Sequence, residues 1–241
     1  MSLLAAERIK LGTTRSPYWC IAAVAAGALL FSLITALNQS GRFASTTGSL
    51  IGVDLSLSIF MVLAALSVTT EYRFNTIRST FLAAPRRVGV LVAKSVVVGL
   101  LGLVVGAVMA LAAFFLAQAL AKDPATPLTL STAEQWRQVL GWGPIFAIAG
   151  VLAVAVGVIV RQSAGAIAIV LIWPLALEGL LKLIPGVADS IGPYLPFTAG
   201  RQFVADGPNL DPSPWVGLGV FAAWTAVIWL LAAALLRGRD A

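Results

Sequence analysis

Long apolar stretches separated by short charged segments run along the whole chain. Six of them are long enough to cross a bilayer, since a helix needs about 20 apolar residues to span the hydrocarbon. We expect these spans at about residues 18–37, 50–70, 95–121, 139–160, 163–184 and 215–236. In hydrocarbon no water can bond open backbone groups, so each span must be helical. The sequence therefore predicts an all-α integral membrane protein with one six-helix domain, residues 1–241.

Composition supports this prediction. Hydrophobic residues make up 59% of the chain and charged residues 11%, whereas a soluble domain carries about 25% charged residues. The first span is longer than the apolar core of a signal peptide, which is about 7–15 residues. We therefore expect a retained helix rather than a cleaved leader.

The charges between the spans predict the orientation of the chain in the cell membrane. Six spans place both termini on one side, and eleven of the sixteen basic residues lie on that side: Arg8, Lys10, Arg15, Arg73, Arg78, Arg86, Arg87, Lys94, Arg161, Arg237 and Arg239. The other side holds Arg42, Lys122, Arg137, Lys182 and Arg201. Basic loops mark the cytoplasmic face, so both termini are expected there. Scattered charges of this kind favour membrane lipids rather than nucleic acid as partners.

The commonest tools of enzyme chemistry are missing from the sequence. The chain has no histidine and a single cysteine, Cys20, within an apolar run. Ser-His-Asp and Cys-His catalysis need a histidine, and a CxxC metal site needs a second cysteine. No G-x-x-x-x-G-K-[ST] loop is present to hold the phosphates of ATP. We expect no catalytic, cofactor-binding or metal-binding residues in this chain.

The segment after the second span is predicted to form a short amphipathic helix, residues 71–84. Its apolar face would consist of Phe74, Ile77 and Phe81, at helical spacing. Polar side chains occupy other positions: Glu71, Tyr72, Arg73, Asn75, Thr76, Arg78 and Ser79. Pro85 ends the helix, because proline has no N–H and its ring clashes with the preceding turn. Such a helix could anchor the chain to anionic lipid with Arg86 and Arg87, or it could dock a partner protein.

Two further segments, residues 122–138 and 185–214, are expected outside the cell. The first contains Ser131-Thr-Ala-Glu134, which fits a capping box at the start of a short helix. The second contains six of the twelve prolines and is expected to form broken helices that cap the outer mouth of the bundle.

Two acidic residues lie inside predicted spans, where charges are costly and often functional. Asp54 begins a helical stripe that could line a transport path or a dimer seam: Asp54, Ser58, Met61, Ala65 and Val68. Its place near the outer end of the span also fits a carboxylate in the headgroup zone without a special role. Glu178 and Lys182 are four residues apart and are expected to form an ion pair.

Several ordered segments resemble the membrane subunit of ABC exporters of the ABC-2 permease class, particularly the short actinobacterial kind. They are Glu7-Arg-Ile-Lys-Leu with Thr14-Arg15-Ser16, Glu71-Tyr-Arg-Phe-Asn-Thr-Ile-Arg, Ala83-Ala-Pro-Arg-Arg with Lys94, Arg161-Gln-Ser-Ala-Gly-Ala-Ile-Ala, Tyr194-Leu-Pro-Phe-Thr-Ala-Gly and Arg237-Gly-Arg-Asp-Ala. This chain has Asn75 where the family commonly has glycine, a change that should be tolerable in an exposed helix.

The resemblance implies a particular assembly. Two six-helix subunits, identical or not, would form a dimer, and residues 71–84 would be the coupling helix that docks on a separate ATPase subunit. ATP and Mg would then bind that partner, and residues 2–16 would form an elbow helix along the inner leaflet. The implied function is outward transport of an amphipathic, drug-like or lipid-like substrate, as in multidrug efflux.

Two other functions fit the residues. An ion-coupled secondary transporter would use Asp54 and Glu178, although no inverted repeat of the kind common in such proteins is evident. A membrane scaffold subunit would carry out no transport of its own.

Overall fold

The computed structural model describes residues 3–13, 15–37, 45–77, 87–120, 128–207 and 210–238. These residues are helical apart from short connections, and none of them forms a strand. Six helical segments are long and apolar enough to cross a membrane: Pro17–Leu37, Ile51–Arg73, Arg87–Leu120, Ala133–Val160, Ser163–Leu181 and Pro214–Gly238. The predicted all-α class with six candidate membrane-spanning segments is confirmed.

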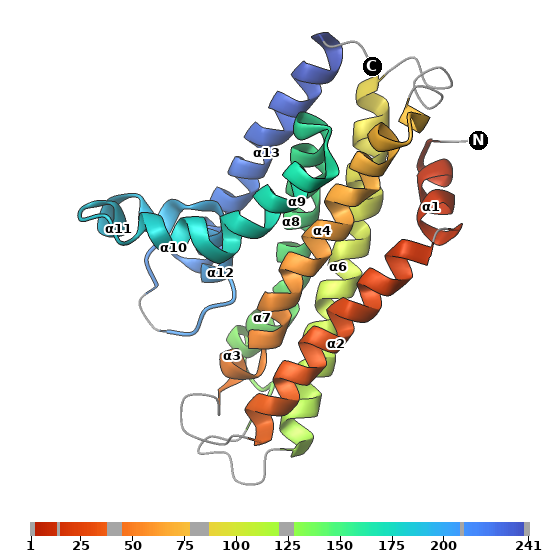
Figure 1. The fold of residues 1–241 in the computed structure, drawn as a ribbon. Coiled ribbons are helices and arrows are strands. Elements are labelled where there is room, and N and C mark those ends of the chain that lie inside the picture. The colour runs from red at the N-terminus through yellow and green to blue at the C-terminus, as the bar shows by residue number, and fades with distance from the viewer. Residues whose placement is uncertain are drawn as a thin grey trace.

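Short connections join most of the helices among the described residues. In chain order they are α1 (Leu3–Thr13), α2 (Arg15–Leu37), α3 (Thr46–Ser49), α4 (Ile51–Arg73), α6 (Arg87–Leu120), α7 (Ala133–Leu140), α8 (Trp142–Val160), α9 (Ser163–Ile172), η2 (Trp173–Leu177), α10 (Glu178–Leu181), α11 (Val187–Ser190), η3 (Gly192–Tyr194), α12 (Pro196–Gln202) and α13 (Pro214–Gly238). In Figure 1, α1, the end of α4, the start of α6 and the end of α13 lie at the same end of the bundle.

Helix α8 forms the centre of the bundle. It packs against α4, α6, α9 and α13, and its apolar side chains are buried on nearly all sides. The rings of Phe60 on α4 and Phe146 on α8 lie 5.4 Å apart between centroids. A helix that is hydrophobic all round belongs in such a central position, and the other spans arrange themselves around it.

Small residues let α6 approach α8 closely. Gly102 and Gly106 are one turn apart on α6, and a Cβ atom at Gly106 would lie 2.5 Å from the carbonyl oxygen of Trp142. At Gly102 the equivalent distance to the carbonyl oxygen of Phe146 is 2.7 Å. Between helices in lipid, association depends on this kind of close van der Waals packing. The two glycines therefore fix the separation of α6 and α8.

Helix α7 begins with the predicted kind of cap, moved by one residue. The N-cap is Thr132, whose Oγ1 accepts from the backbone N–H of Gln135, while Gln135 Oε1 accepts from the N–H of Thr132. The expected box from Ser131 to Glu134 is therefore wrong. The side-chain amide oxygen of Gln135 also accepts from the N–H of Ser131, the donor that Glu134 was expected to serve.

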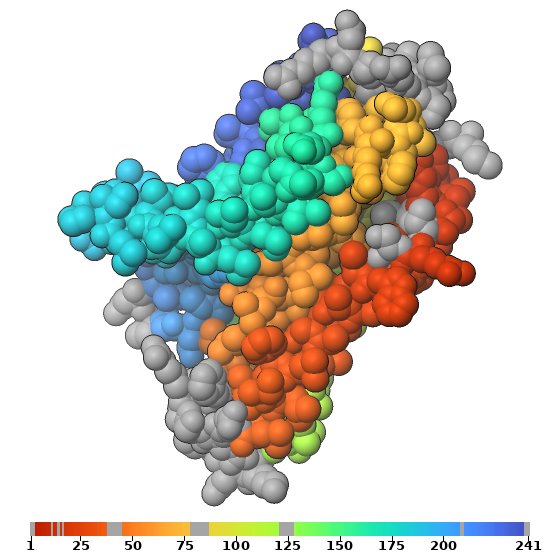
Figure 2. Space-filling model, viewed as in Figure 1, coloured from red at the N-terminus to blue at the C-terminus, as the bar shows by residue number. Residues whose placement is uncertain are grey.

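The fifth span changes its helical form at Pro174. Proline cannot donate to the preceding turn and its ring crowds the carbonyl four residues earlier. The chain widens to the π-helical turn η2 at this point and returns to α-helix in α10. From there α10 and α11 project from the side of the bundle, as the cyan surface in Figure 2 shows, and α12 returns to pack against α13.

Candidate functional site: a buried charge network

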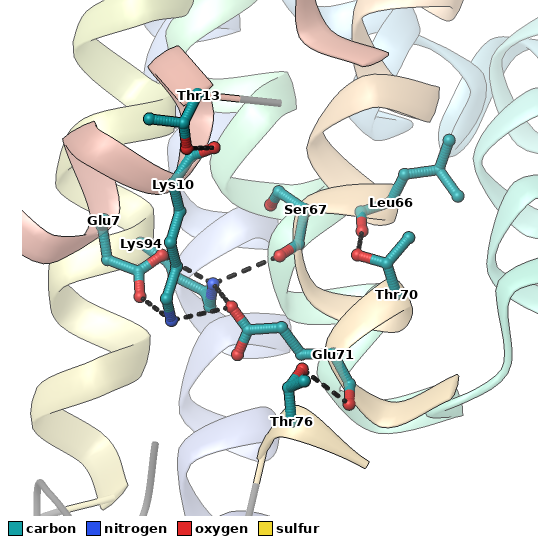
Figure 3. A network of polar contacts seen from close by, with 9 residues as sticks. All are labelled: Glu7, Lys10, Thr13, Leu66, Ser67, Thr70, Glu71, Thr76 and Lys94. Atoms are coloured by element: carbon teal, nitrogen blue, oxygen red, sulfur yellow. Dashed lines mark hydrogen bonds and ion pairs between the residues drawn. The ribbon is translucent and has the colours of Figure 1, made fainter. Parts of the chain in front are cut away.

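Four charged side chains from three helices meet at the end of the bundle that holds α1. Glu7 and Lys10 come from α1, Glu71 comes from the last turn of α4, and Lys94 comes from the second turn of α6. Figure 3 shows the two carboxylates and the two ammonium groups pointing toward one another. Residues separated by up to 87 positions are thereby joined.

Lys94 is the centre of the network. Its Nζ lies 2.6 Å from Glu7 Oε2 and 2.7 Å from Glu71 Oε1, and it also donates to the carbonyl oxygen of Ser67 at 3.2 Å. The side chain is only 4% exposed. All three ammonium protons therefore have acceptors, which is the condition for burying a lysine in its charged form.

Lys10 completes the network on its more exposed side. Its Nζ lies 3.0 Å from Glu7 Oε1 and 3.0 Å from Glu71 Oε1. Burial acts most strongly on the pKa of Lys10 and lowers it, but hydrogen bonds and attraction from Glu7 and Glu71 outweigh burial and leave the pKa above 10.5. Two positive and two negative groups alternate, so the network carries no net charge.

The start of the predicted coupling segment does not have the expected shape. Glu71, Tyr72 and Arg73 continue α4, and Asn75 adopts a left-handed backbone with φ of 57°. Residues 76 and 77 are helical again. The expectation of one unbroken helix over residues 71–84 is wrong, because a left-handed residue ends the α-helical path. Residues 78–84, with Arg78, Ser79 and Phe81, lie outside the described residues.

The left-handed residue explains the choice of asparagine at this position. Glycine and asparagine are the residues that most readily follow a helix end in this conformation. The interpretation of Asn75 as a residue in an exposed helix was therefore wrong. Asn75 fits because it occupies a turn, the one setting in which asparagine can replace glycine at little cost.

The turn also redistributes the side chains that were predicted to share faces. Glu71 is buried in the charge network, whereas Arg73, Phe74, Asn75 and Thr76 are exposed. Phe74 is 67% exposed, but Ile77 is 5% exposed, so these two do not share one face as predicted. The ring of Tyr72 lies 5.3 Å from the Arg161 guanidinium carbon. The exposed surface of this segment thus begins at Arg73.

Asp54 pairs with an arginine that is distant in the sequence. Arg201 on α12 donates through Nε to Asp54 Oδ1 at 2.8 Å. The other four members of the predicted stripe, Ser58, Met61, Ala65 and Val68, are buried inside the subunit. They contribute to the core of the single subunit, and the role of this stripe in a transport path or a dimer seam stays a prediction.

Glu178 has a different role from the expected ion pair. Its carboxylate accepts from the backbone N–H groups of Phe197 and Thr198, at 2.8 and 2.7 Å, and from Thr198 Oγ1 at 2.8 Å. These N–H groups belong to the first turn of α12, where they have no partner within the helix. No Glu178–Lys182 ion pair forms between these two described residues, because the carboxylate is turned toward α12.

The network was missed by the sequence analysis, although faint signals for it exist. Glu7 and Lys10 are three residues apart on one helix, and Lys94 is a lone charge in an apolar stretch. A lone charge in such a stretch requires a partner. The partner of Asp54 was equally visible, since Arg201 is the one basic residue of segment 185–214.

The described residues contain no group of three or more side chains that could hold a metal ion. No protein-family model matches the chain, and no match to a curated protein is found. The likeness to ABC-2 permeases therefore rests on the ordered sequence segments alone, and it stays a prediction.

Proposed function

We propose that the chain is the membrane-spanning permease subunit of an ATP-driven exporter and that a separate ATPase subunit powers it. The observation that carries the proposal is the buried bond between Glu71 and Lys94. Glu71 lies three residues before the exposed turn at Phe74 and Asn75, and Lys94 lies on a different span. A force applied at this turn would reach α4, α6 and α1 together.

The orientation needed for this function follows from the charges. Both termini and the loop after α4 carry most of the basic residues, which favours the cytoplasmic side for this end of the bundle. In that orientation α1 is the elbow helix of the inner leaflet, and the ATPase would contact Arg73, Phe74 and the segment that follows.

The mechanism is a rigid-body movement of two such subunits. Closure of the ATPase around ATP and Mg would push on the loop after α4, and the charge network would prevent α1, α4 and α6 from sliding past one another. An amphipathic, drug-like or lipid-like molecule would leave on the outer side. The chain would contribute binding and movement, and its partner would contribute hydrolysis.

The test is copurification and ATP turnover. The full-length chain in mild detergent is expected to retain a nucleotide-binding subunit, and replacing Arg73 and Phe74 by alanine is expected to reduce that retention and the ATP turnover. Both side chains are exposed, so the fold should survive. Arg237→Ala, an exposed arginine at the end of α13, is the matched control. External labelling of a cysteine placed at Phe74 in intact cells would overturn the orientation.

The geometry gives less support to an ion-coupled transporter that uses Asp54 and Glu178. Asp54 is paired with Arg201, and Glu178 accepts three hydrogen bonds. These contacts give both carboxylates a structural role within the subunit. Uptake driven by a pH gradient in vesicles without an ATPase, lost on Asp54→Asn, would favour that function instead.

A further inference from the structure

An apolar groove runs along the side of the bundle between α1, the start of α2 and α6. Its volume is about 730 Å³. Val96, Leu100 and Val104 lie one helical turn apart on the α6 wall, and Leu4 and Tyr18 line the facing wall. These five side chains are all more than a third exposed. Tyr18 and the three α6 side chains belong to segments that are apolar enough to cross a membrane, so hydrocarbon is the natural medium around them.

The lining of the groove includes one cation. Arg8 is the single charged residue among those that line it. It is exposed, and none of the described acidic side chains lies within ion-pair distance of it. On the same helix Glu7 and Lys10 are turned the other way, into the charge network. Arg8 and Gly12 are four residues apart and share the groove face of α1.

We propose that this groove holds one anionic phospholipid of the surrounding leaflet, with an acyl chain along α6 and its phosphate at Arg8. The guanidinium group can bond two phosphate oxygens at once, which makes arginine a favoured ligand for phosphate. The stripe of Val96, Leu100 and Val104 supplies the apolar surface that an acyl chain covers. The proposal does not depend on the exporter function.

A second copy of the chain fits the groove less well. An arginine at a protein interface requires an acidic partner, because an unpaired charge is costly to bury. The described acidic residues at this end of the bundle are Glu7 and Glu71, and both are already buried in the network. A phospholipid brings its own negative charge and its own apolar chain, so it satisfies both parts of the groove.

Native mass spectrometry of the full-length, delipidated chain tests the proposal. Dioleoylphosphatidylglycerol is expected to bind more tightly than dioleoylphosphatidylcholine. Arg8→Ala is expected to weaken phosphatidylglycerol binding about fivefold, since one basic residue near an anionic surface contributes about 1 kcal/mol. Arg8→Lys keeps the charge and should retain most of the preference.

A second variant tests the apolar part of the groove. A Cβ atom at Gly12 would meet nothing within 4 Å, so Gly12→Leu should fold and fill the groove. It is expected to weaken binding of both lipids. Gly219→Leu on α13, where a Cβ atom also meets nothing within 4 Å, and Arg237→Ala are the matched controls and should change neither affinity.

Three results would overturn the proposal. Equal binding of the two lipids to the unaltered chain would exclude recognition of an anionic headgroup. Unchanged binding in Gly12→Leu would place any bound lipid elsewhere. A dimer that forms on delipidation and is lost in Gly12→Leu would show that a second copy covers the groove.

Discussion

The guanidinium of Arg201 lies 2.8 Å from the carboxylate of Asp54, although 147 positions separate the two residues in the chain. The pair joins α12 to the start of α4, and Arg201 also donates to the carbonyl oxygen of Pro174 in the π-helical turn. Helix α12 is thereby attached both to α4 and to the fifth span.

A double-mutant cycle measures what this pair contributes. Both side chains are about a third exposed, at 34% and 30%, so solvent screening reduces the interaction. We expect a coupling free energy of at most about 1 kcal/mol between Arg201→Met and Asp54→Asn, as for exposed ion pairs. Thermal unfolding of the single and double variants in detergent gives the value. A coupling free energy of zero would mean that the pair does not hold α12.

Removing the central lysine is expected to be far more damaging. Lys94→Met leaves two buried carboxylates with only Lys10 between them, and breaking a buried ion pair costs about 3–5 kcal/mol. Replacing Lys94 by methionine and Glu71 by glutamine together should cost less than Lys94→Met alone. Unfolding temperatures measure both. Lys182→Met changes an exposed lysine and is the control that should have little effect.

Alkaline pH should loosen α1. The pKa of Lys10 is raised above its ordinary value of 10.5, so its contribution is fully present below pH 10.5 and is lost as the pH rises through the raised value. Spin labels at Ile9 and Leu100, both exposed, are expected to give a narrow distance distribution at pH 8 that broadens above pH 10.5. In Lys10→Met the distribution should not change over this interval.

The turn after α4 predicts a contrast between two substitutions at Asn75. Asn75→Gly should preserve or raise stability, because glycine adopts positive φ without steric cost. Asn75→Val should lower stability by about 1–2 kcal/mol, since a β-branched residue is strained in this conformation. Thermal unfolding compares the two variants. Equal stability would show that φ at residue 75 is not positive in the folded protein.

The six spans could be predicted because the bilayer sets both their length and their composition. The segment after α4 could not be predicted in the same way. Residue spacing shows which side chains would share a face of a helix, but it does not show whether the helical backbone is continuous. Phe74 and Ile77 have the right spacing, but Asn75 breaks the path between them. The partners of Glu71 were hidden for another reason: sequence spacing describes one helix, whereas Glu7 and Lys94 come from two others.

The length of α6 has a consequence for the depth of the charge network. A helix of 34 residues is about 51 Å long, whereas the hydrocarbon of a bilayer is about 30 Å thick. Lys94 lies about 10 Å from the start of the helix at 1.5 Å per residue. An α6 that extends past the acyl chains at this end holds Lys94 at the level of the headgroups rather than in the hydrocarbon. In a thinner or thicker bilayer, hydrophobic mismatch changes how far α6 extends beyond the hydrocarbon. The excess length of α6 keeps the ionic contacts of Lys94 outside the hydrocarbon in either case.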